Sequence, residues 1–236
     1  MTLGYGQIDS TIAGFAPVIG VYGVSMAVIL IAAGLHVAFR TDGRQRIASA
    51  SLVLVVLLSG WLLGFQQWTT PTGDAVETTI VQGGITQDRK WLPEQFEPTL
   101  ELYRHSLRTS PKNSIVVWPE VAIPSSLDRV PVYVAELQAE LDENNQTLLF
   151  GILEREDGNI YNSVVRLDGF GEQSYRKRRL VPFGEMFPVP DFVREWMRLM
   201  SLPHSDMSSG ADEQTLIETR EGHKLAVAIC YEDAYG

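Results

Sequence analysis

Residues 225–236 read Leu-Ala-Val-Ala-Ile-Cys-Tyr-Glu-Asp-Ala-Tyr-Gly, and the fold that we expect depends on this stretch. Its first five residues are apolar and have the length of a fully buried strand. Cys230 follows at once and is the only cysteine in the chain. A thiol at the carboxyl end of a strand suits a nucleophile, because ligands of open α/β sheets sit beyond the carboxyl ends of the strands. Unpaired cysteines are more often small core residues, so this stretch alone leaves both interpretations open.

The composition excludes several classes of function. Asp and Glu outnumber Lys and Arg by 29 to 19, which gives a formal net charge of −10. Without a long Lys/Arg run to offset that charge, we expect no nucleic-acid partner. A single cysteine cannot form an internal disulfide or a thiolate-rich metal site, and the four histidines lack metal-ligand spacing. No metal ion is expected.

The first 68 residues differ from the rest of the chain and predict a membrane region. Residues 17–39 and 47–65 carry no charged side chain. As helices they would be roughly 34 Å and 28 Å long, enough to cross a bilayer. A buried hairpin of core helices is the alternative. Residues 69–75 have the composition of a linker, and residues 76–236 form a second domain of ordinary soluble composition.

The connection between the two apolar runs sets the expected topology. It holds Arg40, Arg44 and Arg46, and short loops rich in Lys and Arg remain in the cytoplasm. Both outer ends of the helix pair, and everything from Gln66 onward, should then lie on the other side of the membrane. Residue 1 would also start outside the cytoplasm, which predicts earlier spans in the natural protein.

The second domain alternates strand patterns with helix patterns. We expect strands at residues 77–81, 114–118, 147–153, 160–167, 174–180 and 224–229, and helices at residues 94–107 and 132–142. In the first of these helices, Phe96, Leu100, Tyr103 and Leu107 share one face. Alternation of this kind predicts an α/β domain built in layers.

Three polar residues fall at comparable places in this pattern. Glu120 follows an apolar strand and Pro119, Lys177 lies in a basic segment before residue 180, and Cys230 closes the last strand. A cation favours the thiolate, a carboxylate can move the thiol proton, and an ammonium can stabilise the oxyanion of acyl transfer. Taken singly, Glu120 could be a solvated strand end and Lys177 part of an exposed basic cluster.

Several motifs resemble a known superfamily. Trp-Pro-Glu at residues 118–120, Tyr-Arg-Lys-Arg-Arg-Leu-Val-Pro-Phe-Gly-Glu at 175–185 and Ile-Cys-Tyr-Glu at 229–232 resemble the nitrilase, or carbon–nitrogen hydrolase, superfamily. The membrane lead, with its motifs at residues 3–7 and 21–25, resembles more narrowly the bacterial apolipoprotein N-acyltransferases. Val-Gln-Gly-Gly-Ile at residues 81–85, followed by Trp91, is similar to the same enzymes.

That resemblance implies a fold and a location. The fold is an αββα sandwich of the α/β class, preceded by two transmembrane helices and incomplete at its carboxyl end. The family continues on both sides of this sequence, so we expect the chain to be an internal part of a longer protein. Such proteins are multi-pass enzymes of the bacterial inner membrane whose catalytic domain faces the periplasm.

The resemblance also implies a reaction and roles. An acyl chain would pass from a membrane phospholipid, through a cysteine thioester, to the amine of a diacylglyceryl-cysteine that begins an apolipoprotein, without a cofactor. By this resemblance Cys230 would be the nucleophile, Glu120 the general base and Lys177 the oxyanion stabiliser. Glu185 would position the lysine, Tyr231 and Glu232 would support the nucleophile, and Trp91 would handle substrate.

Other interpretations of the sequence stay open. A membrane-tethered amidase or nitrilase could use the same three residues, and a non-catalytic anchored domain is a third possibility. Residues 191–200 have one apolar helical face. We expect that helix either to pack on the sheet or to act as a lid at the bilayer surface.

Overall fold

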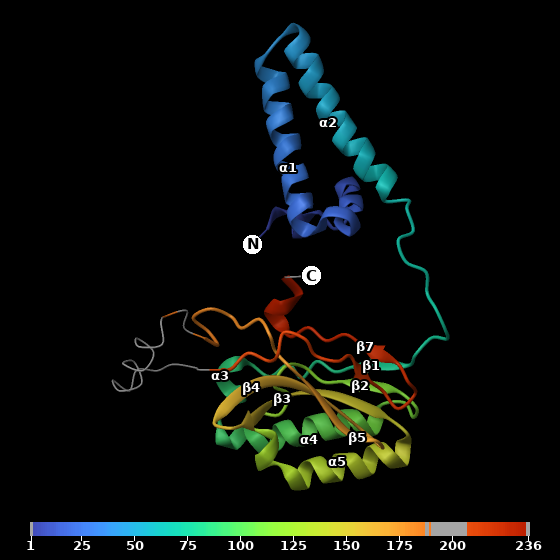
Figure 1. The fold of residues 1–236 in the computed structure, drawn as a ribbon, viewed down its shortest axis with the longest axis vertical. Helices are drawn as coiled ribbons and strands as arrows, with labels where there is room; N and C mark the ends of the chain where they lie inside the picture. Colours follow the sequence, from blue (N-terminus) through green and yellow to red (C-terminus); the bar gives the residue numbers. More distant parts are fainter. Residues whose placement is uncertain (1, 187–188, 190–206, 235–236) are drawn as a thin grey trace. The chain divides into compact units, whose positions relative to one another are not determined.

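The chain forms two compact units, Met1–Asp74 and Ala75–Gly236 (Figure 1). The structure is a computed structural model that describes residues 2–186, 189 and 207–234. The helix expected at residues 191–200 lies outside the described residues.

The first unit is helical. It consists of two short 3-10 helices, η1 (Leu3–Gln7) and η2 (Thr11–Phe15), followed by the long helices α1 (Ala16–Arg40) and α2 (Gly43–Leu63). Among the described residues, two continuous helical segments are long and apolar enough to cross a membrane. They are Thr11–Arg40 and Gly43–Leu63, and in an apolar window of 18 residues within each segment only 22% and 11% of the residues are buried. Their apolar surface faces outward, unlike that of a core helix.

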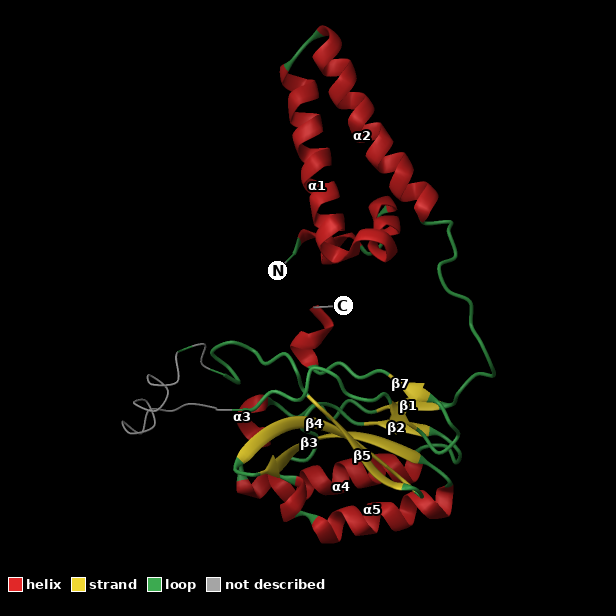
Figure 2. Cartoon of the chain, viewed as in Figure 1, coloured by secondary structure: helices red, strands yellow, loops and turns green. Residues whose placement is uncertain are grey.

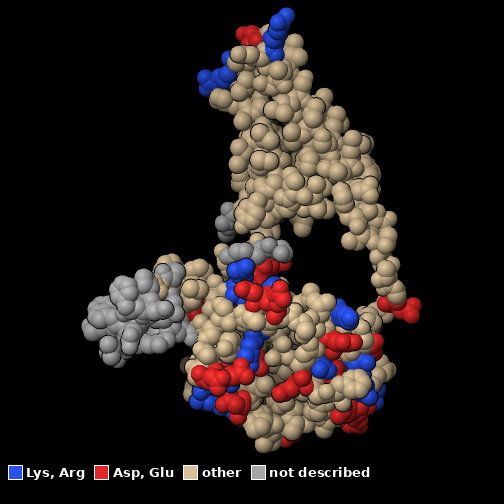
Figure 3. Space-filling view, in the orientation of Figure 1, with Lys and Arg blue, Asp and Glu red and all other residues tan. Residues whose placement is uncertain are grey.

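Glycines allow close packing within this unit. A Cβ on Gly14 would lie 2.0 Å from the carbonyl oxygen of Gly60, and a Cβ on Gly34 would lie 2.6 Å from Val53 Cγ2. Small residues at such contacts let helices approach where lipid provides no hydrophobic driving force. At the α1–α2 connection Arg46 forms an ion pair with Asp42 at 3.1 Å. Figure 3 shows charged side chains at this connection and uncharged ones along both helices.

The second unit is built on a five-stranded sheet with the order β1-β2-β3-β4-β5 (Figure 2). The strands are β1 (Thr78–Ile80), β2 (Ile115–Val117), β3 (Thr147–Glu156), β4 (Asn159–Asp168) and β5 (Gly171–Arg176). The first three run parallel to each other, whereas β4 and β5 pair antiparallel. The helices are α3 (Gln87–Lys90), α4 (Pro93–Thr109) and α5 (Pro131–Asn144), with the 3-10 helix η3 (Leu127–Arg129). The helices expected at 94–107 and 132–142 are confirmed.

Side-chain alternation along the strands gives the sheet two apolar faces. One face packs against α4 and α5 through a large cluster that includes Leu107, Leu137 and Phe150. The opposite face carries a smaller cluster, in which Leu149 and Tyr175 pack with Ile229. This second face brings the segment before Cys230 onto the sheet.

The segment at 224–229 differs from the expected fully buried strand. Strand β7 covers only Lys224–Leu225 and pairs antiparallel with β6 (Ile217–Glu218) in a separate two-stranded sheet. Leu225, Val227 and Ile229 pack on the second cluster, while the alanines between them are exposed. An apolar run of this length was expected to be covered on both faces, but only one face packs. The strand expected at 174–180 also ends earlier, at Arg176, so Lys177 lies just beyond it.

Candidate active site

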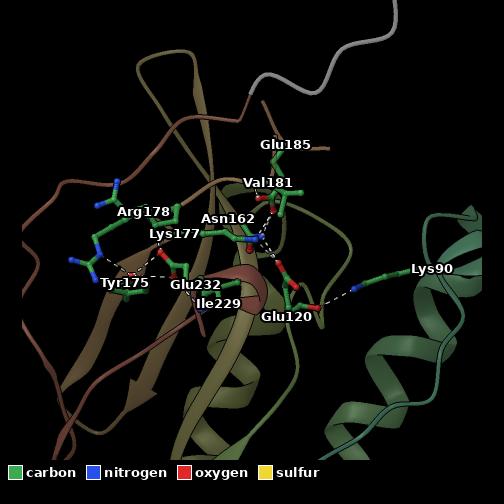
Figure 4. A network of polar contacts seen from close by, with 11 residues as sticks. Lys90, Glu120, Asn162, Tyr175, Lys177, Arg178, Val181, Glu185, Ile229 and Glu232 are labelled. Carbon is green, nitrogen blue, oxygen red and sulfur yellow. Dashed lines mark hydrogen bonds and ion pairs between the residues drawn. The ribbon is translucent and has the colours of Figure 1, made fainter. Parts of the chain in front are cut away.

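Lys177 is the centre of a buried ion cluster. Its ammonium lies 2.8 Å from Glu185 Oε1 and 3.3 Å from Glu120 Oε1, and its side chain is 0% exposed (Figure 4). Burial lowers the pKa of Lys177, but the hydrogen bond to Glu185 and the charge of Glu120 outweigh burial and raise the pKa above its ordinary value. The side chain is therefore a fixed cation at neutral pH.

The strands determine where Lys177 and Glu120 meet. Lys177 directly follows β5, and its backbone N–H donates to the carbonyl of Asn162 in β4 at 2.8 Å. Glu120 follows β2 by way of Pro119, which removes a backbone donor and ends the pairing. Both residues thus lie beyond the carboxyl ends of their strands, the place where α/β sheets present their ligands.

Gly151 of β3 makes the position of Glu120 possible. A Cβ on Gly151 would lie 2.3 Å from the amide nitrogen of Val121 and 2.7 Å from Glu120 Cα. Only glycine therefore lets the backbone around Glu120 approach the strand so closely. Val121 itself has a φ of 46°, an unusual value for a β-branched residue, which marks a sharp turn after Glu120.

Glu185 is the more enclosed of the two carboxylates. Its Oε1 accepts from Lys177 at 2.8 Å and from Asn162 Nδ2 at 3.1 Å, while its Oε2 accepts from the backbone N–H of Val181 at 2.9 Å. These three donors occupy both oxygens. Positioning of the lysine by Glu185 stays a prediction, and the 2.8 Å contact between the two side chains is where it would act.

Glu232 joins the Lys177 segment to the Cys230 turn. Its Oε1 accepts from the backbone N–H groups of Arg178 and Arg179 at 2.7 and 3.0 Å, and its Oε2 accepts from that of Ile229 at 2.9 Å. The Tyr175 hydroxyl donates to the same carboxylate at 3.1 Å. Burial raises the pKa of Glu232, but these hydrogen bonds together outweigh burial and hold the pKa below its ordinary value.

Cys230 begins the 3-10 helix η4 (Cys230–Ala234) and is exposed. Its φ is 52°, in the left-handed region that costs a non-glycine residue about 1–3 kcal/mol and that recurs at functional sites. Within the described part of the chain, its thiol has no hydrogen bond to Glu120, Lys177 or any other group. The structure thus brings Glu120, Lys177 and Glu185 together, whereas Cys230 is linked to them indirectly, through the hydrogen bonds of Glu232 and the packing of Ile229 on the sheet.

The other expected site residues lie at the surface. Trp91 is 49% exposed and follows α3, while Tyr231 is 42% exposed and follows the thiol. Lys90, next to Trp91, donates to the backbone carbonyl of Glu120 at 2.9 Å. Burial lowers the pKa of Lys90, and the nearby charge of Glu120 only partly opposes that effect. Across the residues that the structure describes, no group of three or more His, Cys, Asp or Glu side chains could hold a metal ion.

Sequence reasoning missed Asn162, Gly151 and Lys90. Asn162 is a polar residue in a strand pattern, and only its burial, at 2% exposure, shows that it is not solvated. Gly151 interrupts the apolar strand at 147–153, a signal typical of close backbone approach. No local pattern distinguishes Lys90 from other helix-end lysines.

A buried ammonium between two carboxylates, followed by a turn that exposes a thiol, fits acyl transfer from C–N or C–O bonds. Residues 77–236 match the carbon–nitrogen hydrolase family. The chain belongs to this family and has the fold of the nitrilase superfamily.

Relatives with similar sequences are more specific. The chain is 34% identical over its full length to the apolipoprotein N-acyltransferase of Methylococcus capsulatus, of which it covers 47%. It is 38% identical to the enzyme of that name from Nitrosomonas europaea, again over its full length, and covers 48% of it. The chain spans about half the length of the curated relatives it matches.

A solved structure with a lower similarity is that of Saccharomyces cerevisiae Nit3, a member of branch 10 of the nitrilase superfamily. The identity is 20%, the TM-score 0.39, and the match covers 66% of this chain and 55% of that chain.

Proposed function

We propose that this chain carries the acyl-transfer centre of an apolipoprotein N-acyltransferase. The acyl donor would be a membrane phospholipid, and the acceptor would be the amine of a diacylglyceryl-cysteine at the start of an apolipoprotein. The observation that carries the proposal is the buried Lys177–Glu120–Glu185 cluster, tied through Glu232 to the turn that exposes Cys230. Two apolar helices in the same chain and the names of its relatives support a substrate drawn from the membrane.

The first half-reaction forms a thioester. Glu120 accepts the proton of the Cys230 thiol, and the sulfur attacks the ester carbonyl of the phospholipid. Lys177 stabilises the oxyanion of the tetrahedral intermediate. When the intermediate collapses, the C–O bond of the ester breaks and the lysophospholipid alkoxide takes the proton back from Glu120.

The second half-reaction moves the acyl group to nitrogen. The amine attacks the thioester carbonyl, Glu120 accepts the amine proton, and the C–S bond breaks. The proton returns to the Cys230 sulfur, which restores the starting state. The thioester keeps the acyl group activated, so the transfer needs no separate energy source.

The test uses the protein produced from its natural reading frame and incubated with acyl-labelled phospholipid alone. We expect a hydroxylamine-sensitive adduct on the Cys230 peptide by mass spectrometry. Cys230→Ser should lose turnover, because a serine hydroxyl is far less acidic and its ester reacts less readily with an amine. Cys230→Ala is the control for acylation elsewhere. Acyl transfer that proceeds without an adduct on Cys230 would rule out the covalent route.

A carbon–nitrogen hydrolase is the second candidate, because the family matched by residues 77–236 carries that name. In that reaction water, not an amine, would attack the thioester. Release of free fatty acid from the labelled adduct, with no labelled amide after an amine acceptor is added, would favour the hydrolase.

For the membrane unit, we propose that α1 and α2 are antiparallel spans with the α1–α2 connection in the cytoplasm. The exposed apolar surfaces support the two spans, and the arginines of the short connection support its cytoplasmic side. In a Cys230→Ala background, an impermeant maleimide added to spheroplasts should label Thr70→Cys and leave Thr41→Cys unlabelled until the membrane is opened. The opposite labelling would contradict the topology.

Trp91 is proposed to contact the substrate. It is exposed, and the adjacent Lys90 reaches the carbonyl of Glu120, so its ring lies on a segment anchored to the catalytic cluster. Trp91→Ala should raise KM for phospholipid and leave the alkylation rate of Cys230 unchanged. An unchanged KM would contradict this role.

A further inference from the structure

We propose that Asn162 is a positioning residue that gives the Glu120 and Glu185 carboxylates different roles and makes Glu120 Oε2 the proton-accepting atom. The inference rests on the proposed function, since it assigns the base of that reaction to one oxygen. Asn162 belongs to none of the motifs in which the resemblance to the superfamily lies.

The amide of Asn162 contacts both glutamates at once. Its Nδ2 donates to Glu120 Oε1 at 2.6 Å and to Glu185 Oε1 at 3.1 Å, so both hydrogens of the amide nitrogen are used (Figure 4). An amide oxygen in that place would face two carboxylate oxygens, both of which only accept. The orientation of the side chain therefore follows from its partners.

The two carboxylates differ in how many of their oxygens accept a hydrogen bond. Both oxygens of Glu185 hold donors, from Lys177, Asn162 and Val181. Glu120 accepts from Asn162 and Lys177 through Oε1 alone. In the described structure its Oε2 has no hydrogen-bond partner, and the side chain is 35% exposed. Oε2 is thus the carboxylate oxygen of this cluster that can accept a proton from an incoming thiol or amine.

The backbone of Asn162 strengthens this role. Asn162 lies in β4, and its carbonyl accepts the N–H of Lys177 at 2.8 Å. One residue therefore holds the lysine through its main chain and both glutamates through its side chain. Its own Oδ1 is buried and has no partner among the described residues, so the side chain is held by the glutamates on its nitrogen side.

The charged groups that face Glu120 come from three places. Lys177 follows β5, Glu185 lies in the loop after it, and Lys90 at the end of α3 binds the Glu120 carbonyl. Asn162 is neutral. Replacing its amide with a carboxylate would add a third negative charge to a cluster that has one fully buried cation, and it would remove two donors.

The experiment measures the alkylation rate of Cys230 by iodoacetamide against pH, followed by mass spectrometry of the Cys230 peptide. The readout needs no lipid substrate. In Asn162→Asp we expect the acidic limb of the rate profile to move up by about one pH unit, because an added negative charge beside the cluster makes it harder to form a thiolate nearby. Phospholipid-dependent acylation at neutral pH should fall about 10- to 100-fold, since Glu120 loses the donor that holds its Oε1 and the base is misplaced.

Asn159→Asp is the matched control. It adds the same charge in the same strand, and it keeps the oxygen that accepts from Ser208 at 2.9 Å. Its profile should follow that of the wild type. Asn162→Ser is the second variant in case the aspartate prevents folding. It is neutral and its hydroxyl can donate to only one carboxylate, so the limb should move in the same direction by less.

A folded Asn162 variant with the wild-type limb would overturn the inference, as would an equal shift in Asn159→Asp. If the acidic limb moves in Asn162→Asp but the wild type transfers no acyl group to any amine, the inference about Asn162 holds and the proposed function is wrong. If the wild type transfers acyl groups to an amine but the limb does not move in Asn162→Asp, the proposed function holds and the inference is wrong.

Discussion

The two halves of the candidate site are built in opposite ways. The Lys177 half is buried at the end of a regular sheet, and both of its glutamates are held by several donors. The Cys230 half lies on an irregular turn, exposed, with a left-handed backbone and a thiol that accepts and donates no hydrogen bond within the described structure. Burial and hydrogen bonds fix the charged half, whereas the turn that carries the nucleophile is anchored by the Glu232 carboxylate and by Ile229 packed on the sheet.

The strongest way to break the buried half is Lys177→Met. It leaves two carboxylates facing each other without their cation, and removing one partner of a buried ion pair destabilises a protein by roughly 3–5 kcal/mol. Activity should be lost. Thermal unfolding in detergent measures the stability, with exposed Lys112→Met as the control.

The charges of the cluster determine the direction in which the stability of Lys177→Met should change with pH. In the variant, the two carboxylates repel each other, and protonation of one of them removes the repulsion, so stability should return as the pH falls. In the wild type, the pKa of Lys177 is raised in the folded protein. Its contribution to stability is therefore fully present below the pKa of the unfolded chain and is lost as the pH rises through the folded pKa. Adding Glu185→Gln should restore part of the stability. If Lys177→Met is as stable as the wild type at neutral pH, the Lys177 ammonium does not stabilise the fold through the two glutamates.

Glu232→Gln should disrupt the exposed half of the site, the turn that carries Cys230. The amide keeps one acceptor oxygen, but its NH2 would face a backbone N–H that now points at the carboxylate. We expect a loss of about 1–3 kcal/mol and a roughly 100-fold slower acylation of Cys230, because the turn loses its anchor. Glu172→Gln, an exposed residue of β5, is the control. Equal acylation rates in the two variants would contradict the anchoring role.

The same contrast explains what the sequence could predict. Runs such as residues 114–118 and 147–153 predict β2 and β3 because both faces of those strands pack. The run at 225–229 has a similar composition, yet only alternate residues are covered, and composition does not distinguish one-sided from two-sided burial. Among the candidate site residues, Asn162 could not be predicted, since its role comes from two glutamates 42 and 23 residues away in the chain.

Gly151→Ala should disturb the buried half less strongly. The new Cβ would lie within 2.7 Å of three backbone atoms, so the segment that carries Glu120 must shift. Overpacking of this kind destabilises by about 1–3 kcal/mol, and a displaced base should slow acylation roughly ten-fold. Gly184→Ala is a matched control near the site, since its Cβ would make contacts of 3.4 Å or more. If both alanine variants acylate at the wild-type rate, Gly151 does not position Glu120.

Tyr175→Phe should give the smallest effect and sharpen the role of Glu232. The ring stays in the second apolar cluster, and only the hydroxyl is lost, which donates to the carboxylate and accepts from Arg178 Nε at 3.2 Å. The three backbone donors to Glu232 remain. We expect a loss of about 0.5–1.5 kcal/mol at neutral pH and a change of a few-fold in acylation. Tyr161→Phe is the control, because the Tyr161 ring lies under Arg176 and its hydroxyl makes no hydrogen bond in the described structure.

The pH dependence of Tyr175→Phe decides whether the hydroxyl acts through Glu232. Glu232 has a lowered pKa, so its contribution to stability is present above the unfolded pKa and is lost as the pH falls through the folded value. Losing the Tyr175 hydrogen bond brings the folded pKa closer to its ordinary value. The stability difference between wild type and variant should therefore be largest near neutral pH and shrink in acid. A difference that stays constant down to pH values below the pKa of Glu232 would mean that the hydroxyl stabilises the fold independently of that carboxylate.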